Sequence, residues 1–257
     1  MQTKTESAIR HHAMAEYPRE CCGLVIIERG RERYVPCTNE AASSEHFRLP
    51  ASEYADAETR GEIIAVVHSH PDMPARPSEA DKVACEASGL PWIIVRVDGP
   101  EPVTQEIVTI EPCGYQAPLV GRSFAHGVLD CYTLIRDWYQ RERHITLLDF
   151  EREDEWWNKG QDLYMQHFAE AGFTRLPDTA PLQVGDVILM QIRADATNHG
   201  AVYIGDGLML HHLYGRLSTR DVYGGYWREV TRMLLRRLSS SGTCALTVID
   251  EEQLYRS

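Results

Sequence analysis

The stretch HSHPDMPARPSEAD, residues 68–81, decides the fold of the first half of the chain. It follows five apolar residues, 63–67, and such a run bounded by polar and turn residues predicts a buried strand. His68 and His70 are two residues apart, so an extended backbone directs both side chains to one face. Asp81 follows at the start of a predicted helix. Two imidazoles and a carboxylate at a strand end suit a catalytic zinc ion, which takes three protein ligands and keeps a fourth position for water.

A catalytic zinc ion also needs a base that takes the proton from its water. We expect Glu20 in this role, because it lies at the entry of another apolar strand, in YPRECCGLVII, residues 17–27. A second interpretation of the downstream motif stays open. Ser78 is a good helix N-cap, and Asp81 suits the first turn of a helix. The two interpretations are compatible, since a capped Asp81 would be held rigidly.

The pattern of an upstream Glu before a glycine-containing strand, then H-x-H, seven residues and S-x-x-D, resembles the JAMM metalloproteases. This resemblance implies an α/β sheet flanked by helices, with Zn²⁺ bound by His68, His70 and Asp81. It also implies that Glu20 is the general acid/base. Ser78 would hydrogen-bond the developing oxyanion.

The composition narrows the class of protein. The 257 residues allow one large domain or two modest ones. A net charge of −12 argues against broad electrostatic binding to nucleic acid or to an anionic membrane. With no apolar stretch near 18 residues and no basic amphipathic start, we expect neither membrane insertion nor a signal peptide. The seven cysteines include no C-x-x-C pair, which favours reduced thiols and a reducing cytoplasm.

Hydrophobic patterning predicts alternating strands and helices in the first part of the chain. Helices are expected at 1–16 and 79–88, the second closed by a glycine, and strands near 22–28, 33–36, 63–68, 92–97 and 105–110. The predicted division is a first domain at 1–112, a linker rich in turn formers at 113–118, a second domain at 119–237 and an extension at 238–257 with a strand at 245–249.

The second module opens with GRSFAHGVLDC, residues 121–131. Asp130 is a good N-cap for a helix that runs from Cys131 to about residue 140. An i, i+3, i+4, i+7 stripe, predicted to be buried, comprises Cys131, Leu134, Ile135 and Trp138. A thiol in the first turn lies at the positive end of the helix dipole, which lowers its pKa and favours the thiolate. We also expect an amphipathic helix to begin at 151–157, with its tryptophans packed inward.

A nucleophilic cysteine needs a base, and HGAVYIGDGLMLH, residues 199–211, predicts a β-hairpin that carries histidines. If Ile204 pairs with Leu208, Ala201 lies opposite His211. His199 is then the diagonal neighbour of His211 on the same face. A bulge at a glycine of the tip would slip this register by one.

We expect the helix of Cys131 to pack on the face that His199 and His211 share. His212 stays open as an alternative partner for His199. The order of cysteine and histidines, together with LQVGDVI at 182–188, resembles the NlpC family of papain-like cell-wall cysteine peptidases. This resemblance implies an α+β papain-like fold in which Cys131 is the nucleophile, His199 the base and His211 its orienting group. It further implies that Asp130 holds the amine of a peptidoglycan stem peptide.

A JAMM module followed by an NlpC module resembles a family of tail-tip components of long-tailed bacteriophages. The resemblance implies an α+β protein that is a hydrolase, with a zinc-dependent (iso)peptidase site and a Cys-His-His endopeptidase site that cleaves cell-wall stem peptides. It would act in tail assembly or cell-wall penetration. The implied partners are peptidoglycan or another peptide substrate and other tail-tip proteins. The implied locations are the host cytoplasm during assembly and the virion tail tip. The alternative is a structural or chaperone-like assembly protein that makes little or no catalytic use of its sites.

Overall fold

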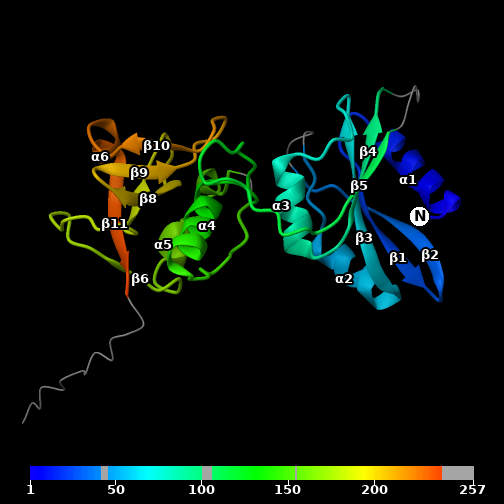
Figure 1. The fold of residues 1–257 in the computed structure, drawn as a ribbon, viewed down its shortest axis with the longest axis horizontal. Helices are drawn as coiled ribbons and strands as arrows, with labels where there is room; N and C mark the ends of the chain where they lie inside the picture. Colours follow the sequence, from blue (N-terminus) through cyan, green and yellow to red (C-terminus); the bar gives the residue numbers. More distant parts are fainter. Residues whose placement is uncertain (42–45, 100–105, 154, 239–257) are drawn as a thin grey trace, which may run out of the picture.

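The computed structural model describes residues 1–41, 46–99, 106–153 and 155–238, which form two halves, each built on its own sheet (Figure 1). Both halves mix helices with strands, so the predicted α+β class is confirmed. The predicted strand at 245–249 and all but the first residue of the predicted extension lie outside the described residues.

The first half holds a five-stranded sheet in the order β2-β1-β3-β4-β5. Strands β3 and β4 are parallel, and the other neighbours are antiparallel. The elements are α1 (Thr3–Glu16), β1 (Cys22–Glu28), β2 (Arg31–Cys37), α2 (Ala51–Arg60), β3 (Glu62–Pro71), α3 (Glu79–Ser88), β4 (Trp92–Val97) and β5 (Ile107–Ile110). Helix α2 was not expected, because it buries only Ala57 and shows no apolar stripe.

Alternation along β3 decides which helix each of its residues meets. Val67 packs with Ile9 of α1 on one face of the sheet. Val66 packs with Ala57 of α2 and Cys85 of α3 on the other face. Two residues after Val66, the side chain at position 68 therefore points to the side of α2 and α3.

The second half holds a six-stranded antiparallel sheet in the order β10-β9-β8-β7-β11-β6. Its elements are α4 (Cys131–Arg143), the 3₁₀ helix η1 (Trp156–Asn158), α5 (Leu163–His167), β6 (Phe173–Arg175), β7 (Val187–Met190), β8 (His199–Gly205), β9 (Leu208–His211), β10 (Thr219–Val222), α6 (Tyr226–Val230) and β11 (Thr231–Arg237). Helix α4 begins at Cys131, as predicted, and its buried stripe faces the sheet.

Helix α4 packs on the face of β8 that carries Gly200 and Val202, whereas Ala201 belongs to the core on the opposite face. The expectation that α4 covers the face shared by the two histidines is therefore wrong. Apolar residues of α4 pack with Val202 on the other face, and Gly200 permits their close approach, because a Cβ at position 200 would lie 2.9 Å from Ile135 Cδ1. The N-terminus of α4 still reaches β8 one residue from His199.

The expected amphipathic helix at 151–157 is also wrong for the described residues. Only the 3₁₀ turn Trp156–Asn158 forms there, although Trp156 is buried as predicted. The cause lies in Arg152, whose guanidinium donates to the carbonyls of Phe150 and Gly127 and to the Asp130 carboxylate. These tertiary contacts hold the charged segment in an irregular conformation.

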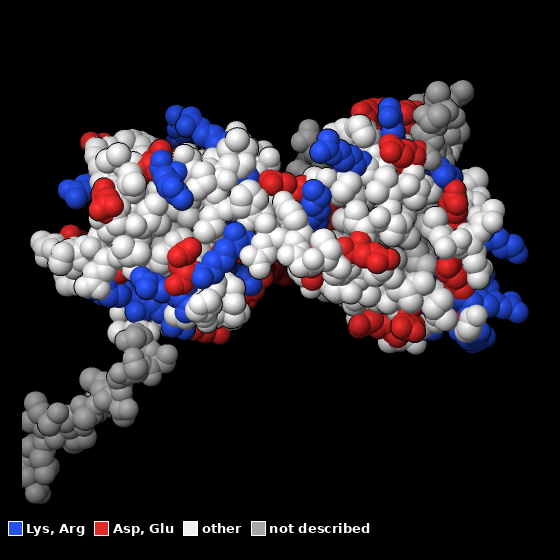
Figure 2. All heavy atoms as spheres, in the orientation of Figure 1, with Lys and Arg blue, Asp and Glu red and all other residues white. Residues whose placement is uncertain are grey.

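The two halves meet beside α3 (Figure 1). The backbone N–H of Ser123 donates to Glu79 Oε2 at 3.2 Å, and Arg48 forms an ion pair with Glu151. On the face drawn in Figure 2, acidic and basic side chains are interspersed over both halves. Within the described ranges, no helix combines the length and the apolar character that crossing a membrane requires.

Candidate active sites

Three predicted metal ligands converge where β3 ends and α3 begins. His68 Nε2 and His70 Nε2 lie 3.1 Å apart. Asp81 Oδ1 lies 3.2 Å from His68 Nε2, and Asp81 Oδ2 lies 3.4 Å from His70 Nε2. All three residues are buried. The sequence spacing therefore brings together the ligand set that it predicted.

This donor set fits a tetrahedral zinc ion. Ligand atoms about 2.0–2.1 Å from such an ion lie about 3.3 Å from one another. The separations of 3.1–3.4 Å among the His68, His70 and Asp81 atoms match that spacing. Two imidazoles and one carboxylate also leave one position of the tetrahedron for water or substrate.

Contacts on the side away from the candidate metal position orient the imidazoles of His68 and His70. Pro74 O lies 2.9 Å from His70 Nδ1, so Nδ1–H donates to this carbonyl and the Nε2 lone pair faces the shared centre. The His68 ring stacks on Phe47 at 4.9 Å and meets the edge of Trp92 at 5.4 Å. Protein contacts thus orient both rings.

The charges within this cluster favour an ionised carboxylate. Burial alone would raise the pKa of Asp81, but hydrogen bonds with His68 and His70 outweigh burial and hold that pKa well below its ordinary value. Burial lowers the pKa of His68. For His70, burial is outweighed by the hydrogen bonds with Asp81 and Pro74, and its pKa is raised. Metal binding would displace any proton shared within the cluster.

Ser78 caps α3, as the second interpretation predicted. Its Oγ accepts from Asp81 N at 3.1 Å, and Asp81 Oδ2 accepts from Ser78 N at 2.7 Å. This capping box fixes the Asp81 carboxylate and leaves the Ser78 O–H as a donor. Asp81 therefore belongs both to the helix cap and to the candidate metal site, so the two interpretations of this motif are compatible.

Glu20 is 4% exposed and precedes β1. Cys22 pairs with His68, and Ser69 N donates to Cys21 O at 3.2 Å. On that register Glu20 lies opposite His70 and shares its face of the sheet. Its role as general acid/base stays a prediction.

Cys131 is the first residue of α4 and is half-buried. Its Sγ lies 3.1 Å from the hydroxyl of Tyr164, and the backbone N–H of Gly200 also donates to it. Among the hydrogen bonds of the described residues, none joins Cys131 to His199. The predicted nucleophile therefore contacts the backbone of the residue that follows the predicted base, His199.

The expected lowering of the thiol pKa is wrong for this arrangement. Burial and the neighbouring Asp130 carboxylate raise the pKa of Cys131 to about 11, although the bonds from Tyr164 and Gly200 act in the opposite direction. The expectation rested on the helix dipole alone, although Asp130 is adjacent to Cys131 in the sequence. The two stronger influences arise from packing and from the N-cap itself.

Asp130 is buried and has several partners within the protein. It caps α4 by accepting from Thr133 N at 2.8 Å, as predicted, and it also accepts from Gly127 N at 3.0 Å. Arg152 Nε donates to it at 2.8 Å, and both side chains of this pair are 4% exposed. A substrate amine would compete with these partners, so the predicted substrate contact of Asp130 stays a prediction.

The two histidines of the hairpin are in contact. His199 Nε2 lies 3.1 Å from His211 Nδ1, and both side chains are buried. Ala201 pairs with His211 as predicted. The expected pairing of Ile204 with Leu208 is wrong, because a bulge between Tyr203 and Gly205 pairs Gly205 with Leu208 instead. The bulge lies near the tip, so the histidine register is unaffected.

His211 has a second partner that the sequence analysis missed. Its Nε2 lies 3.0 Å from Asp221 Oδ2. No motif in the sequence marks Asp221, which reaches His211 because β10 pairs with β9 and sets Asp221 opposite Met209, two residues from His211. The alternative partner, His212, contacts the Arg216 carbonyl with its Nε2 at 3.1 Å.

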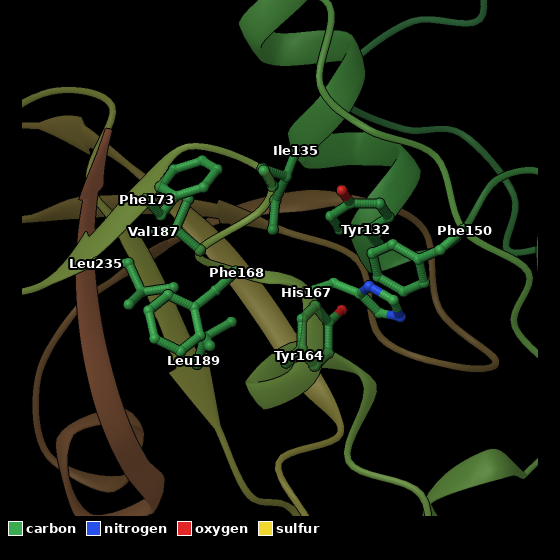
Figure 3. Close-up of a pocket in the computed structure, with 11 residues that line it drawn as sticks. Tyr132, Ile135, Phe150, Tyr164, His167, Phe168, Phe173, Val187, Leu189 and Leu235 are labelled. Carbon is green, nitrogen blue, oxygen red and sulfur yellow. The ribbon is translucent and has the colours of Figure 1, made fainter. Parts of the chain in front are cut away.

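A small apolar cavity of about 20 Å³ lies beneath α4, and Tyr164 forms part of its wall (Figure 3). Binding pockets for small molecules are more than tenfold larger, about 300–1,000 Å³. This cavity is therefore a packing gap in the core. One of its lining residues, Tyr164, also contacts the Cys131 sulfur through its hydroxyl.

Comparisons with known proteins identify a family for each half of the chain. Residues 2–109 match the family of prokaryotic homologs of the JAB domain, and residues 121–236 match the NlpC/P60 family. The CysO-cysteine peptidase of Mycobacterium tuberculosis H37Rv is 33% identical over 89 residues, which are 31% of this chain and 61% of that protein.

Two relatives extend over most of the chain. Tail tip assembly protein K of Escherichia phage N15 is 43% identical over 239 residues, covering 92% of this chain and 95% of that protein. Tail tip assembly protein K of Escherichia phage lambda is 41% identical over 188 residues, covering 73% of this chain and 88% of that protein. Both domain matches and these identities lead to one conclusion: the chain belongs to the tail tip assembly protein K family.

Proposed function

We propose that this protein is a tail-tip peptidase with two sites, of which the second cleaves the stem peptides of bacterial peptidoglycan. The observation that carries the proposal is the hydrogen bond between His199 and His211, next to the backbone that contacts the Cys131 sulfur. The match to the NlpC/P60 family supports a peptidoglycan-related substrate.

The second site supports acyl transfer to sulfur. His199 takes the thiol proton, and Cys131 Sγ attacks the carbonyl carbon of an amide beside D-glutamate. His199 then returns the proton to the leaving amine, and water hydrolyses the thioester. The Tyr164 hydroxyl and the Gly200 N–H both contact the sulfur, and both lower the pKa of Cys131 and so favour the thiolate that this step forms.

The first site supports hydrolysis of a second peptide bond. His68, His70 and Asp81 would hold Zn²⁺, which when bound polarises a carbonyl and acidifies water. Glu20 would accept the proton from the attacking water, and the Ser78 O–H would donate to the developing oxyanion. The name of the CysO-cysteine peptidase supports a peptidase role. A protein tail, an isopeptide and a peptidoglycan crosslink are the candidate substrates.

Membership of the family supports a location and partners for these activities. We place the protein at the virion tail tip after assembly in the host cytoplasm, in contact with other tail proteins. The division into domains at 1–112 and 119–237, with a linker at 113–118, is part of this proposal. It would give each site its own folded unit.

One observation favours the alternative of a structural or chaperone-like assembly protein. Cys131 is paired with Tyr164, and its pKa is raised to about 11, so the free protein holds a thiol at neutral pH. In that case the two sites would persist as parts of the fold without turnover.

Peptide release from purified sacculi separates these functions. Cys131→Ala should abolish release and keep zinc, and His68→Ala should lose zinc and keep release. The exposed Cys113→Ala serves as the matched control and should change neither. Full lytic activity in Cys131→Ala would show that the cysteine peptidase assignment is wrong.

A further inference from the structure

The carboxylate of Asp221 completes a line of hydrogen bonds that begins at His199. His199 Nε2 lies 3.1 Å from His211 Nδ1, and His211 Nε2 lies 3.0 Å from Asp221 Oδ2. The His211 side chain is 1% exposed, while that of Asp221 is 41% exposed. The line therefore runs from the buried site to the surface along one face of the sheet.

The fold fixes Asp221 in this place. Strand β10 pairs Thr219 with His211 and Asp221 with Met209, so Asp221 is the diagonal neighbour of His211 on the same face. Trp227 of α6 meets the His211 ring with its edge at 4.7 Å between centroids. The imidazole is thus held between a carboxylate, an indole and a second imidazole.

This arrangement selects one tautomer for each histidine. Burial lowers the pKa of both His199 and His211, so each ring carries one proton at neutral pH. A carboxylate accepts and does not donate, so the His211 proton lies on Nε2 and its Nδ1 accepts from His199 Nε2–H. His199 Nδ1 then keeps the lone pair that a general base requires.

Without the Asp221 carboxylate, the hydrogen bond between His211 and His199 can run in the opposite direction. His211 could carry its proton on Nδ1 and donate to His199 Nε2, which would move the His199 proton to Nδ1. His199 could then accept no proton from the thiol on that side. The other charged or titratable groups acting on this line are His212 and Arg216, and both lower the pKa of a histidine in it.

We propose that Asp221 is a positioning residue that fixes the tautomers of His211 and His199 and so keeps His199 Nδ1 free to take the Cys131 proton. The step breaks the S–H bond and forms an N–H bond, which leaves a thiolate and an imidazolium. Asp221 stabilises that imidazolium through His211. This inference rests on the proposed cysteine peptidase site.

The first test needs no substrate and no variant. In the ¹⁵N spectrum of the imidazoles at pH 7, His199 and His211 should each show protonated Nε2 and unprotonated Nδ1. Protonated Nδ1 on either ring would overturn the proposal. This readout is independent of whether the protein cleaves peptidoglycan.

The second test measures alkylation of Cys131 by iodoacetamide as a function of pH, with the modified peptide quantified by mass. Asp221→Ala should lower the rate at pH 7 by about 10-fold and move the pH midpoint upward. The amide of Asp221→Asn can donate as well as accept, so it no longer selects the tautomer and should lower the rate in the same direction. The exposed Glu229→Ala is the control and should leave the profile unchanged. An unchanged profile in Asp221→Ala would contradict the proposal even if the wild type proved to be no peptidase.

Discussion

The hydroxyl of Tyr164 lies 3.1 Å from Cys131 Sγ, so the partner of the thiol in the free protein is a phenol and not an imidazole. Tyr164 lies on α5 and is buried, and its ring also lines the small cavity beneath α4 (Figure 3). The same side chain therefore supports the core and sets the polarity around the sulfur.

Tyr164→Phe tests this relationship. The hydroxyl lowers the pKa of Cys131, so its loss should raise that pKa further above about 11. A rise of about half a pKa unit corresponds to about threefold less thiolate at a given pH. The rate of Cys131 alkylation across pH 7–10 measures the thiolate fraction, with the exposed Tyr226→Phe as control. Faster alkylation in Tyr164→Phe would mean that the hydroxyl suppresses the thiolate.

Buried histidines predict a loss of stability in mild acid. Burial lowers the pKa of His199 from 6.5 to about 3, so the unfolded chain binds this proton more readily than the folded protein. The stability that neutral His199 contributes is present above about pH 6.5 and is lost as the pH falls toward 3, with a slope of up to about 1.4 kcal/mol per pH unit.

Urea unfolding of wild type and His199→Gln between pH 7 and pH 4 checks this slope. The variant should lose less stability than the wild type over that range, whereas the exposed His11→Gln should follow the wild type. Parallel curves for wild type and His199→Gln would refute the buried, neutral state of His199.

The capping box of α3 links helix stability to metal affinity. Ser78→Ala removes the acceptor for Asp81 N, which is one of the two bonds of the capping box that positions the ligand carboxylate, and leaves the bond from Ser78 N to Asp81 Oδ2. We expect a loss of about 1 kcal/mol in unfolding free energy and about 10-fold weaker zinc binding, measured by chelator competition. The exposed Ser7→Ala in α1 is the control. A destabilised variant with wild-type zinc affinity would contradict the link between the helix cap and metal affinity.

The buried pair of Asp130 and Arg152 predicts a large stability loss. Both side chains are 4% exposed, so Arg152→Met would leave a carboxylate buried without its cation. The cost should be about 3–5 kcal/mol in urea unfolding. The pair of Lys159 and Glu153 is half-exposed, and Lys159→Met should cost at most about 1 kcal/mol. Equal losses in the two variants would contradict a structural role for the buried pair.

Local patterns in the sequence predicted much of both sites. The two-residue spacing of His68 and His70 fixed their common face, and the cap signal fixed where Asp81 would stand. Alternation also predicted that Ala201 pairs with His211. This prediction held because the bulge lies near the tip of the hairpin, beyond the histidines. These features depend on neighbours in the chain, which a single sequence displays.

The remainder depends on tertiary contacts. Asp221 acquires its role through the pairing of β10 with β9, and no motif marks it. The pKa of the Cys131 thiol follows first from burial, which depends on tertiary packing, and then from the charge of Asp130; together they outweigh the bonds from Tyr164 and Gly200. The face of β8 that α4 covers depends on tertiary packing, in which Gly200 permits the close approach of Ile135, and no local pattern in the sequence measures that approach.

Digestion of defined muropeptides, with products identified by mass, tests most directly whether the two sites are separate peptidases. Wild type should cleave the amide beside D-glutamate, Cys131→Ala should lose that product, and His68→Ala should retain it. The same products at the wild-type rate from Cys131→Ala would contradict the account.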